Sequence, residues 1–306
     1  MMRLNCWGAV LVLVLWAGCS SAPPAPEGVQ ERKNRAADYL KFGRQAFQET
    51  HFDQALAFYL IAVDLNTAVD NEPGMAVAWN SVATAQAALG KTDEARAALT
   101  QAEALATSSG DRTLVLQVAV NLVQSDLSAG DSDAASQRLA TLAPFPATAE
   151  GAALDHSLGT LEKVRDNLDG ALAAFDRALV VNEKLGLKQE MATNHYMKAS
   201  VLGRLGRWSE AQTELTTALA LDKTMENTLG IGQDLRSLGS VALKLMRPKE
   251  AFDSYVRAYR LFQAAGLEDQ QRKTLELLVP LAGTLGPAGD QTRYQALLDQ
   301  LEPPRK

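Results

Sequence analysis

Two stretches of the sequence, L-G-K-T-D-E-A at Leu89–Ala95 and L-G-R-W-S-E-A at Leu205–Ala211, are near copies of each other. A weaker copy, L-M-R-P-K-E-A, occupies Leu245–Ala251. In the first two stretches a glycine follows the leucine that ends one apolar run, and polar residues then precede a new amphipathic pattern. Because glycine readily adopts the left-handed conformation that closes a helix, these stretches predict a helix end, a tight turn and a helix start.

The alanine that ends these stretches recurs along most of the chain. The recurrences are Ala55, Ala95, Ala135, Ala171, Ala211 and Ala251, spaced by 40, 40, 36, 40 and 40 residues. A large apolar or aromatic residue follows each of these marker alanines four positions later, and an alanine follows five of the six at seven positions. Since this spacing puts all three residues on one helix face, the chain is predicted to be an array of stacked helix pairs.

The pattern resembles the tetratricopeptide repeat family, whose motif is W-x2-L-G-x2-Y followed by G-x-Y-x2-A-x3-F-x2-A. The second repeat matches it through Trp79, Val82, Ala83, Gly90, Ala95, Leu99 and Ala102. The sixth matches through Leu235, Leu238, Gly239, Ala242, Ala251, Tyr255 and Ala258. The resemblance implies an all-α fold, a right-handed superhelical solenoid of antiparallel helix pairs. The period exceeds the family's usual 34 residues, which predicts longer helices.

The turns and domain limits follow from the same register. Within pairs, left-handed turns are predicted at Gly90, Gly130 and Gly206, with Asp93, Ser132 and Ser209 as candidate helix caps. Breaks between pairs are predicted at Gly110-Asp111-Arg112, Gly186-Leu187 and Gly266-Leu267, and the short 36-residue step falls at Pro144-Phe145-Pro146. Residues 34–266 should therefore form six repeats, and residues 267–306 a helical cap and tail with helices at 268–285, where Pro280 would kink or end the helix, and 291–301.

The N-terminal residues have the form of an export signal, predicted over residues 1–18. Arg3 precedes an apolar stretch, Cys6–Ala17, that is too short for a transmembrane helix. Ala17-Gly18-Cys19 resembles a bacterial lipobox, although Trp16 departs from it, and the resemblance implies that Cys19 is lipidated. It also implies a cell-envelope lipoprotein facing the periplasm, with Ser20 favouring the outer membrane. The alternative is cleavage after Ala22, which would release a periplasmic protein.

Residues 19–33 are predicted to tether the body to the membrane, because their prolines disfavour helix and sheet. The rest of the composition disfavours nucleic-acid binding and catalysis. The chain has 306 residues, with 30 Lys and Arg against 36 Asp and Glu, so there is no net basic field for nucleic acid. His51, His156 and His195 are scattered, and no catalytic or nucleotide-binding motif is complete. The sequence predicts a protein without catalytic activity, cofactor or metal.

Function is therefore expected in a surface, and the family resemblance implies a groove lined by the first helix of each pair. On the register of the marker alanines, the groove residues are Arg44, Gln48, Asn80, Thr84, Gln117, Gln124, His156, Thr160, Lys163, Tyr196, Ser200, Arg204, Gln233, Arg236, Ser240 and Lys244. Five of these are basic and none is acidic, which predicts an acidic segment on the partner. The alternative is that these are ordinary solvated helix faces.

These observations lead to two hypotheses of function. The first is a non-catalytic cell-envelope lipoprotein whose groove binds a protein or peptide, as an adaptor or assembly factor. The alternative is a small-ligand-binding repeat lipoprotein associated with a transporter, in which the superhelix closes around a pocket.

Overall fold

In a computed structural model of the chain, the described residues are 28–287 and 289–301. The predicted signal peptide, Cys19 and most of the predicted tether lie outside them. The tether is predicted to reach residue 33, but helix α1 begins at Val29. Residues 29–33 contain good helix formers and no proline or glycine, so the helix extends back to the last glycine before it. No helix in the described part of the chain is long and apolar enough to span a bilayer.

Fourteen helices account for most of the described residues, and each odd-numbered helix packs on the even-numbered helix that follows it. Their bounds are α1 (Val29–Gln48), α2 (Phe52–Thr67), α3 (Glu72–Ala88), α4 (Thr92–Ser109), α5 (Arg112–Ser128), α6 (Ser132–Leu142), α7 (Ala149–Val164), α8 (Leu168–Leu185), α9 (Lys188–Arg204), α10 (Trp208–Thr224), α11 (Thr228–Lys244), α12 (Pro248–Ala264), α13 (Glu268–Leu285) and α14 (Asp290–Leu301). The prediction of an all-α repeat solenoid is confirmed.

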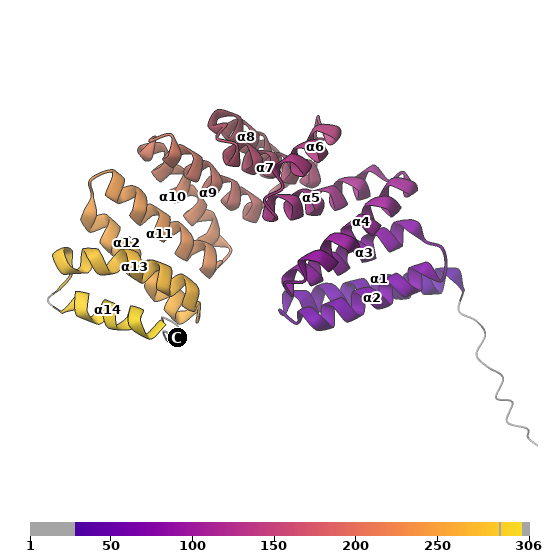
Figure 1. Ribbon diagram of the computed structural model, residues 1–306, viewed down its shortest axis with the longest axis horizontal. Helices are drawn as coiled ribbons and strands as arrows, with labels where there is room; N and C mark the ends of the chain where they lie inside the picture. The colour runs from indigo at the N-terminus through magenta and orange to yellow at the C-terminus, as the bar shows by residue number, and fades with distance from the viewer. Residues whose placement is uncertain (1–27, 288, 302–306) are drawn as a thin grey trace, which may run out of the picture.

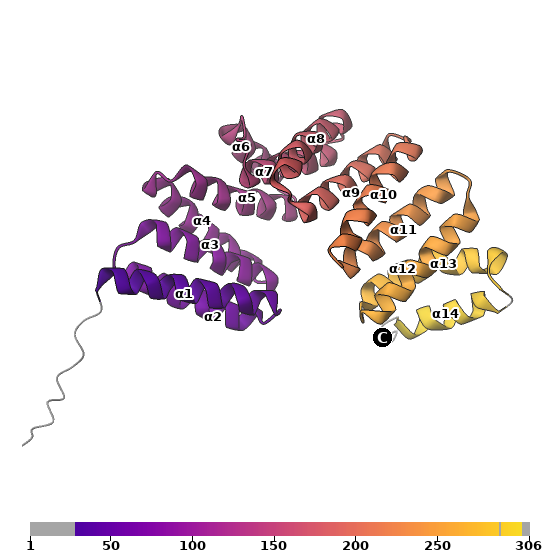
Figure 2. The same ribbon diagram turned by 180° about the vertical axis from the view of Figure 1, so that it is seen from behind.

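The helix pairs follow one another in an arch, with α1–α4 at one end and α11–α14 at the other (Figure 1). Seen from either side, α6 and α8 lie on the outer edge of the arch, and α5 and α7 lie nearer its inside (Figure 2). Contacts agree with this curvature, because α1 touches α3, α3 touches α5, α5 touches α7 and α7 touches α9. The first helices of the pairs therefore line the inner face of the arch.

Left-handed turn residues recur about every twenty positions. Within pairs they are Thr50, Gly90, Gly130, Asp166, Gly206 and Met246, and between pairs they are Asp70, Gly110, Gly186, Glu226 and Gly266. The glycines among them confirm the predicted turns and breaks. The five other residues were not anticipated, because only glycine adopts this conformation without a steric penalty.

The predicted helix caps are wrong. The N-cap residues of α4, α6 and α10 are Lys91, Asp131 and Arg207, which directly follow the left-handed residue. Asp93, Ser132 and Ser209 already lie inside the first turn of these helices. Of the three N-cap residues, only Asp131 caps its helix with a side chain, by accepting a hydrogen bond from the backbone N–H of Ala134 at 3.0 Å. The turns are so tight that the next helix begins one or two residues earlier than the candidate caps require.

The core lies between the two helices of each pair and between neighbouring pairs. All six marker alanines are buried, at 5% exposure or less. The large residues four positions after them pack against a small residue of the first helix, sixteen positions earlier in the sequence. Three of these partners are glycines, Gly43, Gly159 and Gly239, and an added Cβ would lie within 2.3–2.7 Å of the rings of Tyr59, Phe175 and Tyr255.

The 36-residue step shortens the third pair. Helix α6 ends at Leu142, just before Pro144, and has 11 residues against 16 to 18 in the other second helices up to α12. Helix α7 packs more on α5 than on the short α6. At the C-terminus, α13 and α14 match the predicted helices to within one residue and form a seventh pair, with Pro280 inside α13 rather than at its end.

Candidate functional site

Three pockets open between the first helices of successive pairs, at corresponding positions of the repeats. The N-terminal pocket lies between α1 and α3 and has a volume of about 330 Å³. The central pocket, between α7 and α9, has about 200 Å³, and the C-terminal pocket, between α9 and α11, has about 140 Å³. Each pocket also reaches a residue near the end of the intervening second helix. These inner pockets are thus a repeated feature of the inner face.

The N-terminal and C-terminal pockets share one construction. In the N-terminal pocket, Nδ2 of Asn71 donates to Oδ1 of Asn66 at 2.6 Å. In the C-terminal pocket, Nδ2 of Asn227 donates to Oδ1 of Asp222 at 2.9 Å. A glycine of the next helix lies against each pair, because a Cβ on Gly230 would lie 2.1 Å from Oδ2 of Asp222, and the counterpart Gly74 is equally close to Asn66. Both arrangements fix the second-helix residue at the base of the pocket.

The bases of the three inner pockets differ from one another in polarity. In the central and C-terminal pockets the base is made by one residue from the second helix and one from the next first helix, twelve positions later: Asn182 with Asn194, and Asp222 with Asp234. In the N-terminal pocket only Asn66 of the corresponding pair lines the base, because Ala78 is not part of the lining. All these residues are buried. Among the described residues, Oδ1 of Asn182 has no hydrogen-bond partner, whereas the side chain of Asp234 is hydrogen-bonded to Asp222. Since buried polar atoms are nearly always paired, Oδ1 of Asn182 marks the central pocket as incomplete.

A histidine forms one wall of the central pocket. The Nδ1–H of His156 donates to Oδ1 of Asn194 at 2.8 Å, which connects α7 to α9. Burial lowers the pKa of His156, so its ring is neutral at pH 7. The amide of Asn194 is held in turn by the backbone carbonyl of Glu190, at 2.9 Å. The central pocket therefore combines amide and imidazole groups with the carboxylate of Glu190 in its wall.

The C-terminal pocket is acidic at its base. Asp222 is 6% exposed and Asp234 is 1% exposed. Burial, and then the neighbouring carboxylate of Asp222, raise the pKa of Asp234 to about 8. Two buried carboxyl groups that face each other cannot both ionise without a positive charge nearby, so the pair holds a proton at neutral pH.

The structure places the predicted groove residues on the first helices, and some of them line the inner pockets. Those in pocket walls are Gln117, Gln124, His156, Tyr196 and Gln233. Others contact their own or a neighbouring pair: Asn80 accepts from Asn121, while Thr84, Thr160 and Ser240 each have a partner for their hydroxyl oxygen. Arg44, Gln48 and Ser200 are exposed.

The basic groove residues toward the C-terminal half are already engaged within the protein. Arg204 donates to Oδ1 of Asp166 at 2.7 Å and to the carbonyl of Lys163 at 2.5 Å. Arg236 donates to Oε1 of Gln270 at 2.8 Å and lies over the ring of Phe262. Lys244 similarly lies over Trp208, 5.7 Å from the ring centroid. These contacts connect successive helix pairs.

Carboxylates do lie on the inner face, at positions other than the predicted groove residues. Asp222 and Asp234 line the C-terminal pocket, and Glu190 lines the central one. The sequence analysis considered the positions that project into the groove, whereas these carboxylates lie deeper, at the contact between pairs. The sequence contains one signal for Asp234. The corresponding residues of two other repeats, Ala78 and Val118, are apolar, so an acid at this position is unusual.

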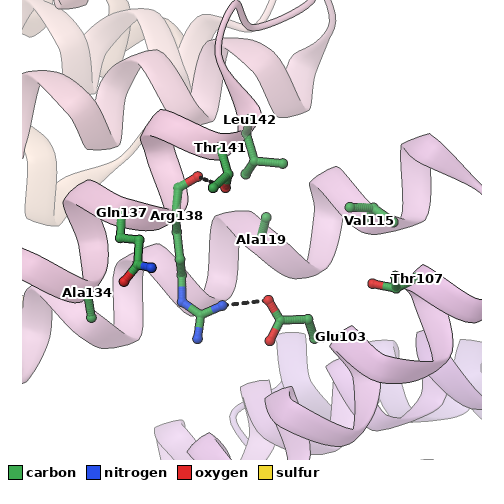
Figure 3. Close-up of a pocket in the computed structure, with 9 residues that line it drawn as sticks. All are labelled: Glu103, Thr107, Val115, Ala119, Ala134, Gln137, Arg138, Thr141 and Leu142. Carbon is green, nitrogen blue, oxygen red and sulfur yellow. Dashed lines mark hydrogen bonds and ion pairs between the residues drawn. The ribbon is translucent and has the colours of Figure 1, made fainter.

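A further cavity opens on the other side of the helix layer, between the second helices α4 and α6. It has a volume of about 360 Å³, and Figure 3 shows Val115 and Ala119 of α5 at its floor. Arg138 of α6 reaches across to Oε1 of Glu103 of α4, at 2.5 Å (Figure 3). Its charged groups, Arg138 and Glu103, are thus paired with each other, and within the described part of the chain no unpaired buried side-chain atom lines it. It is the space left beside the short α6.

Among the described residues, no three His, Cys, Asp or Glu side chains gather as ligands of a metal ion. The fold and its inner face define an elongated helical-repeat protein with recurrent pockets. No protein-family model and no curated protein matches the sequence. Solved structures match the fold at low sequence identity.

The solved structures include a signal-transduction ATPase with a tetratricopeptide repeat sensor from Pyrococcus horikoshii, with a TM-score of 0.65 and 11% identity over 89% of this chain and 42% of that one. A Rap protein complexed with competence and sporulation factor has a TM-score of 0.63 and 14% identity, over 87% and 74%. A chain of the Cut9–Hcn1 hetero-tetramer has a TM-score of 0.63 and 17% identity, over 81% and 44%. The chain thus spans less than half the length of two of these three. It has the tetratricopeptide repeat fold.

Proposed function

We propose that this protein is a non-catalytic scaffold whose inner face binds a segment of another protein. The observation that carries the proposal is the pair of adjacent inner pockets, central and C-terminal, with buried polar side chains at their bases. Both pockets use α9 as a wall, so one bound segment crossing α9 can reach both. In the central pocket Oδ1 of Asn182 lacks a hydrogen-bond partner among the described residues, and a donor group of the segment would complete that hydrogen bond.

The volumes of the central and C-terminal pockets favour a protein segment over a small ligand. The central and C-terminal pockets, at about 200 and 140 Å³, are smaller than the roughly 300–1,000 Å³ typical of small-molecule sites. Each suits one side chain rather than one whole ligand. Two similar structures, the Rap protein with competence and sporulation factor and the Cut9–Hcn1 hetero-tetramer, are complexes, which supports binding as the role of this chain too.

We further propose that the protein is a cell-envelope lipoprotein, anchored through Cys19 and acting as an adaptor or assembly factor at the outer membrane. The support is the sequence Ala17-Gly18-Cys19 after a short apolar stretch. An acidic partner segment stays a prediction. It would have to compete with Asp166 for Arg204 and with Gln270 for Arg236, because those contacts exist within the protein.

The proposal is tested by photocrosslinking in whole cells. A photoreactive residue replaces Thr193, which is exposed on α9 between the two pockets, and in a matched protein it replaces Thr216, which is exposed on the second helix α10. We expect Thr193 to capture one defined protein and Thr216 not to capture it. Equal capture at both positions, or none at Thr193, would contradict the proposal. The mass of the N-terminal peptide of the same preparation tests lipidation of Cys19.

A further inference from the structure

The N-terminal end of the solenoid carries a cluster of three aromatic rings. Tyr39 and Phe42 of α1 and Phe58 of α2 lie with their ring centroids 5.9–6.0 Å apart in all three pairings. Phe42 is 47% exposed, and Tyr39 and Phe58 are partly exposed. The residues that correspond to Phe42 in the second and third repeats, Val82 and Leu122, are at most 2% exposed, and each of those repeats has a helix pair before it. In the described part of the chain no helix precedes α1, so this aromatic cluster lies at an uncovered end.

The fold does not require aromatic residues at these three positions. Relative to the marker alanines, the corresponding residues of the fifth repeat are His195, Lys198 and Glu214. They form a charged network, in which Glu214 accepts from Lys198 at 2.8 Å and also pairs with His195. The end pairs of a solenoid normally present a polar outer face to water. Three exposed rings in contact at this end therefore favour a docking surface over an ordinary cap.

A proline-rich segment leads into the helix that carries two of the three rings. Residues 23–26 have the sequence Pro-Pro-Ala-Pro and lie outside the described residues, and α1 begins directly after Gly28. Their P-x-x-P spacing is typical of segments that adopt the polyproline II conformation and bind to aromatic-lined surfaces. Gly28 itself has φ −65° and ψ 155°, close to that conformation. The chain thus has both a proline-rich segment and, on the adjoining helix, the kind of surface that binds one.

We propose that the aromatic cluster binds the chain's own proline-rich segment, residues 23–26, which covers the N-terminal end of the solenoid. A polyproline II segment advances about 3.1 Å per residue, so Pro23 lies up to about 16 Å from Gly28. Along α1, at about 1.5 Å per residue, Tyr39 lies about 17 Å from Gly28. Helical side chains lean toward the N-terminus, so the rings of Tyr39 and Phe42 lie over the turn before their own Cα atoms, within that reach. The segment can therefore lie antiparallel to α1 across the rings.

The position of the proline-rich segment favours it over other occupants of the aromatic cluster. Its attachment to α1 keeps it near the rings at any protein concentration, whereas a second copy of the chain or a bilayer has to be brought there. Residues 23–26 also remain in the mature chain whether it begins at Cys19 or after Ala22. The inference goes beyond the proposed function, because it concerns the end of the solenoid and not its inner face.

Docking also determines where the predicted anchor lies. Nine residues separate Cys19 from Gly28, and in extended form they span about 28 Å. Helix α1 has 20 residues and is about 30 Å long. A docked segment therefore brings Cys19 alongside the C-terminal end of α1, whereas a free segment leaves it ahead of the N-terminal end.

The test is a distance measurement between two spin labels by pulsed electron paramagnetic resonance. It uses the predicted mature chain, residues 19–306, which contains all fourteen described helices and, with Cys19→Ser, no native cysteine. The labels are attached through Ser21→Cys, beyond the prolines, and Gln45→Cys, at an exposed position of α1. A docked segment should give a narrow distribution below about 25 Å, and a free one a broad distribution reaching about 45 Å. A broad distribution in this protein would overturn the inference.

The matched variant is taken from the fifth repeat. Tyr39→His with Phe42→Lys and Phe58→Glu reproduces its charged network, so this triple variant should fold, which thermal unfolding verifies. It should convert the narrow distribution into the broad one. The control, Val180→Lys, replaces a 51% exposed apolar residue of α8 and should leave the distribution narrow. A distribution that stays narrow in the triple variant would contradict the inference.

The same proteins identify the other occupants, each of which would overturn the inference. Loss of the short distance on addition of excess unlabelled protein would show that the segment binds to another copy. A broad distribution in a protein that sediments as a dimer, with a monomeric triple variant, would assign the aromatic cluster to a second copy. A broad distribution together with binding to vesicles of phosphatidylethanolamine and phosphatidylglycerol, lost in the triple variant, would assign it to a bilayer.

Discussion

At the scale of single residues, each helix pair contains one contact in which a small residue and a large side chain fit each other in size. The first helix supplies a small residue, and the second supplies a large one sixteen positions later. The pairs are Gly43 with Tyr59, Ala83 with Leu99, Val123 with Leu139, Gly159 with Phe175, Ala199 with Leu215, and Gly239 with Tyr255. Glycine occurs where the partner is aromatic, and alanine or valine where it is leucine. The packing volume between the helices is thus kept nearly constant from repeat to repeat.

This complementarity in size can be tested by replacing the small and large residues of one repeat with those of another. Gly159→Ala should destabilise the protein by about 1–3 kcal/mol, because the new Cβ would lie 2.7 Å from the Phe175 ring. Adding Phe175→Leu creates the combination already present at Ala199 and Leu215, and should recover part of that loss. Urea unfolding of the single and double variants measures the coupling. Strictly additive effects would show that the two side chains do not share one space.

At the scale of elements, the third pair depends on charge to compensate for the short α6. Asp126 of α5 is 1% exposed and accepts from Arg96 of α4 at 3.0 Å and from Arg138 of α6 at 2.9 Å. Arg138 also pairs with Glu103. This network joins α4, α5 and α6 at the place where α6 is too short to provide a full apolar face.

Removal of the central acid should loosen this junction. Asp126→Ala leaves two arginines without their shared partner, and we expect a loss of about 1.5–3 kcal/mol in the free energy of unfolding. Asp133→Ala is the matched control, because Asp133 pairs with Arg165 but its side chain is fully exposed, so little change is expected. Equal effects of the two substitutions would mean that burial of Asp126 is unimportant.

At the scale of the whole molecule, the arch is held by contacts between successive pairs, and the Asp222–Asp234 junction makes those contacts sensitive to pH. Asp234 retains its proton in the folded protein up to a pKa of about 8, whereas the unfolded chain loses it near the ordinary value of 3.8. Between these values the folded state binds more protons than the unfolded state. The contribution of Asp234 to stability is therefore greatest in acid and declines as the pH rises to about 8.

Comparison of the wild type with Asp234→Asn separates the contribution of Asp234 to stability from the contributions of other titrating groups, such as Asp155 and His156. The stability of the wild type relative to the variant should fall as pH rises from 5 to 8, by at most about 1.4 kcal/mol per pH unit. Chemical unfolding at several pH values measures it. A difference that stays constant with pH would show that Asp234 titrates normally.

The sequence by itself determined the repeat register, the limits of the last two helices and the turns that contain glycine. The marker alanines, the 40-residue period and the glycines at Gly90 or Gly110 are local signals, because helical periodicity and left-handed backbone are set by neighbouring residues. It also placed the groove on the first helices, through the family resemblance. The five left-handed turns without glycine, such as Thr50, were not predicted, because residues other than glycine adopt this conformation only with a steric penalty.

Only the tertiary structure decided what the inner face carries. Asp222 and Asp234 are twelve positions apart and belong to different helix pairs, and Arg204 meets Asp166 across 38 residues. Such meetings depend on how far each pair is rotated and shifted relative to the last, a quantity set by the summed packing of all side chains at the junction. The spacing of residues along the chain is enough to tell which of them share a helix face. Which residues of the next helix pair that face contacts is decided only when the helices pack together.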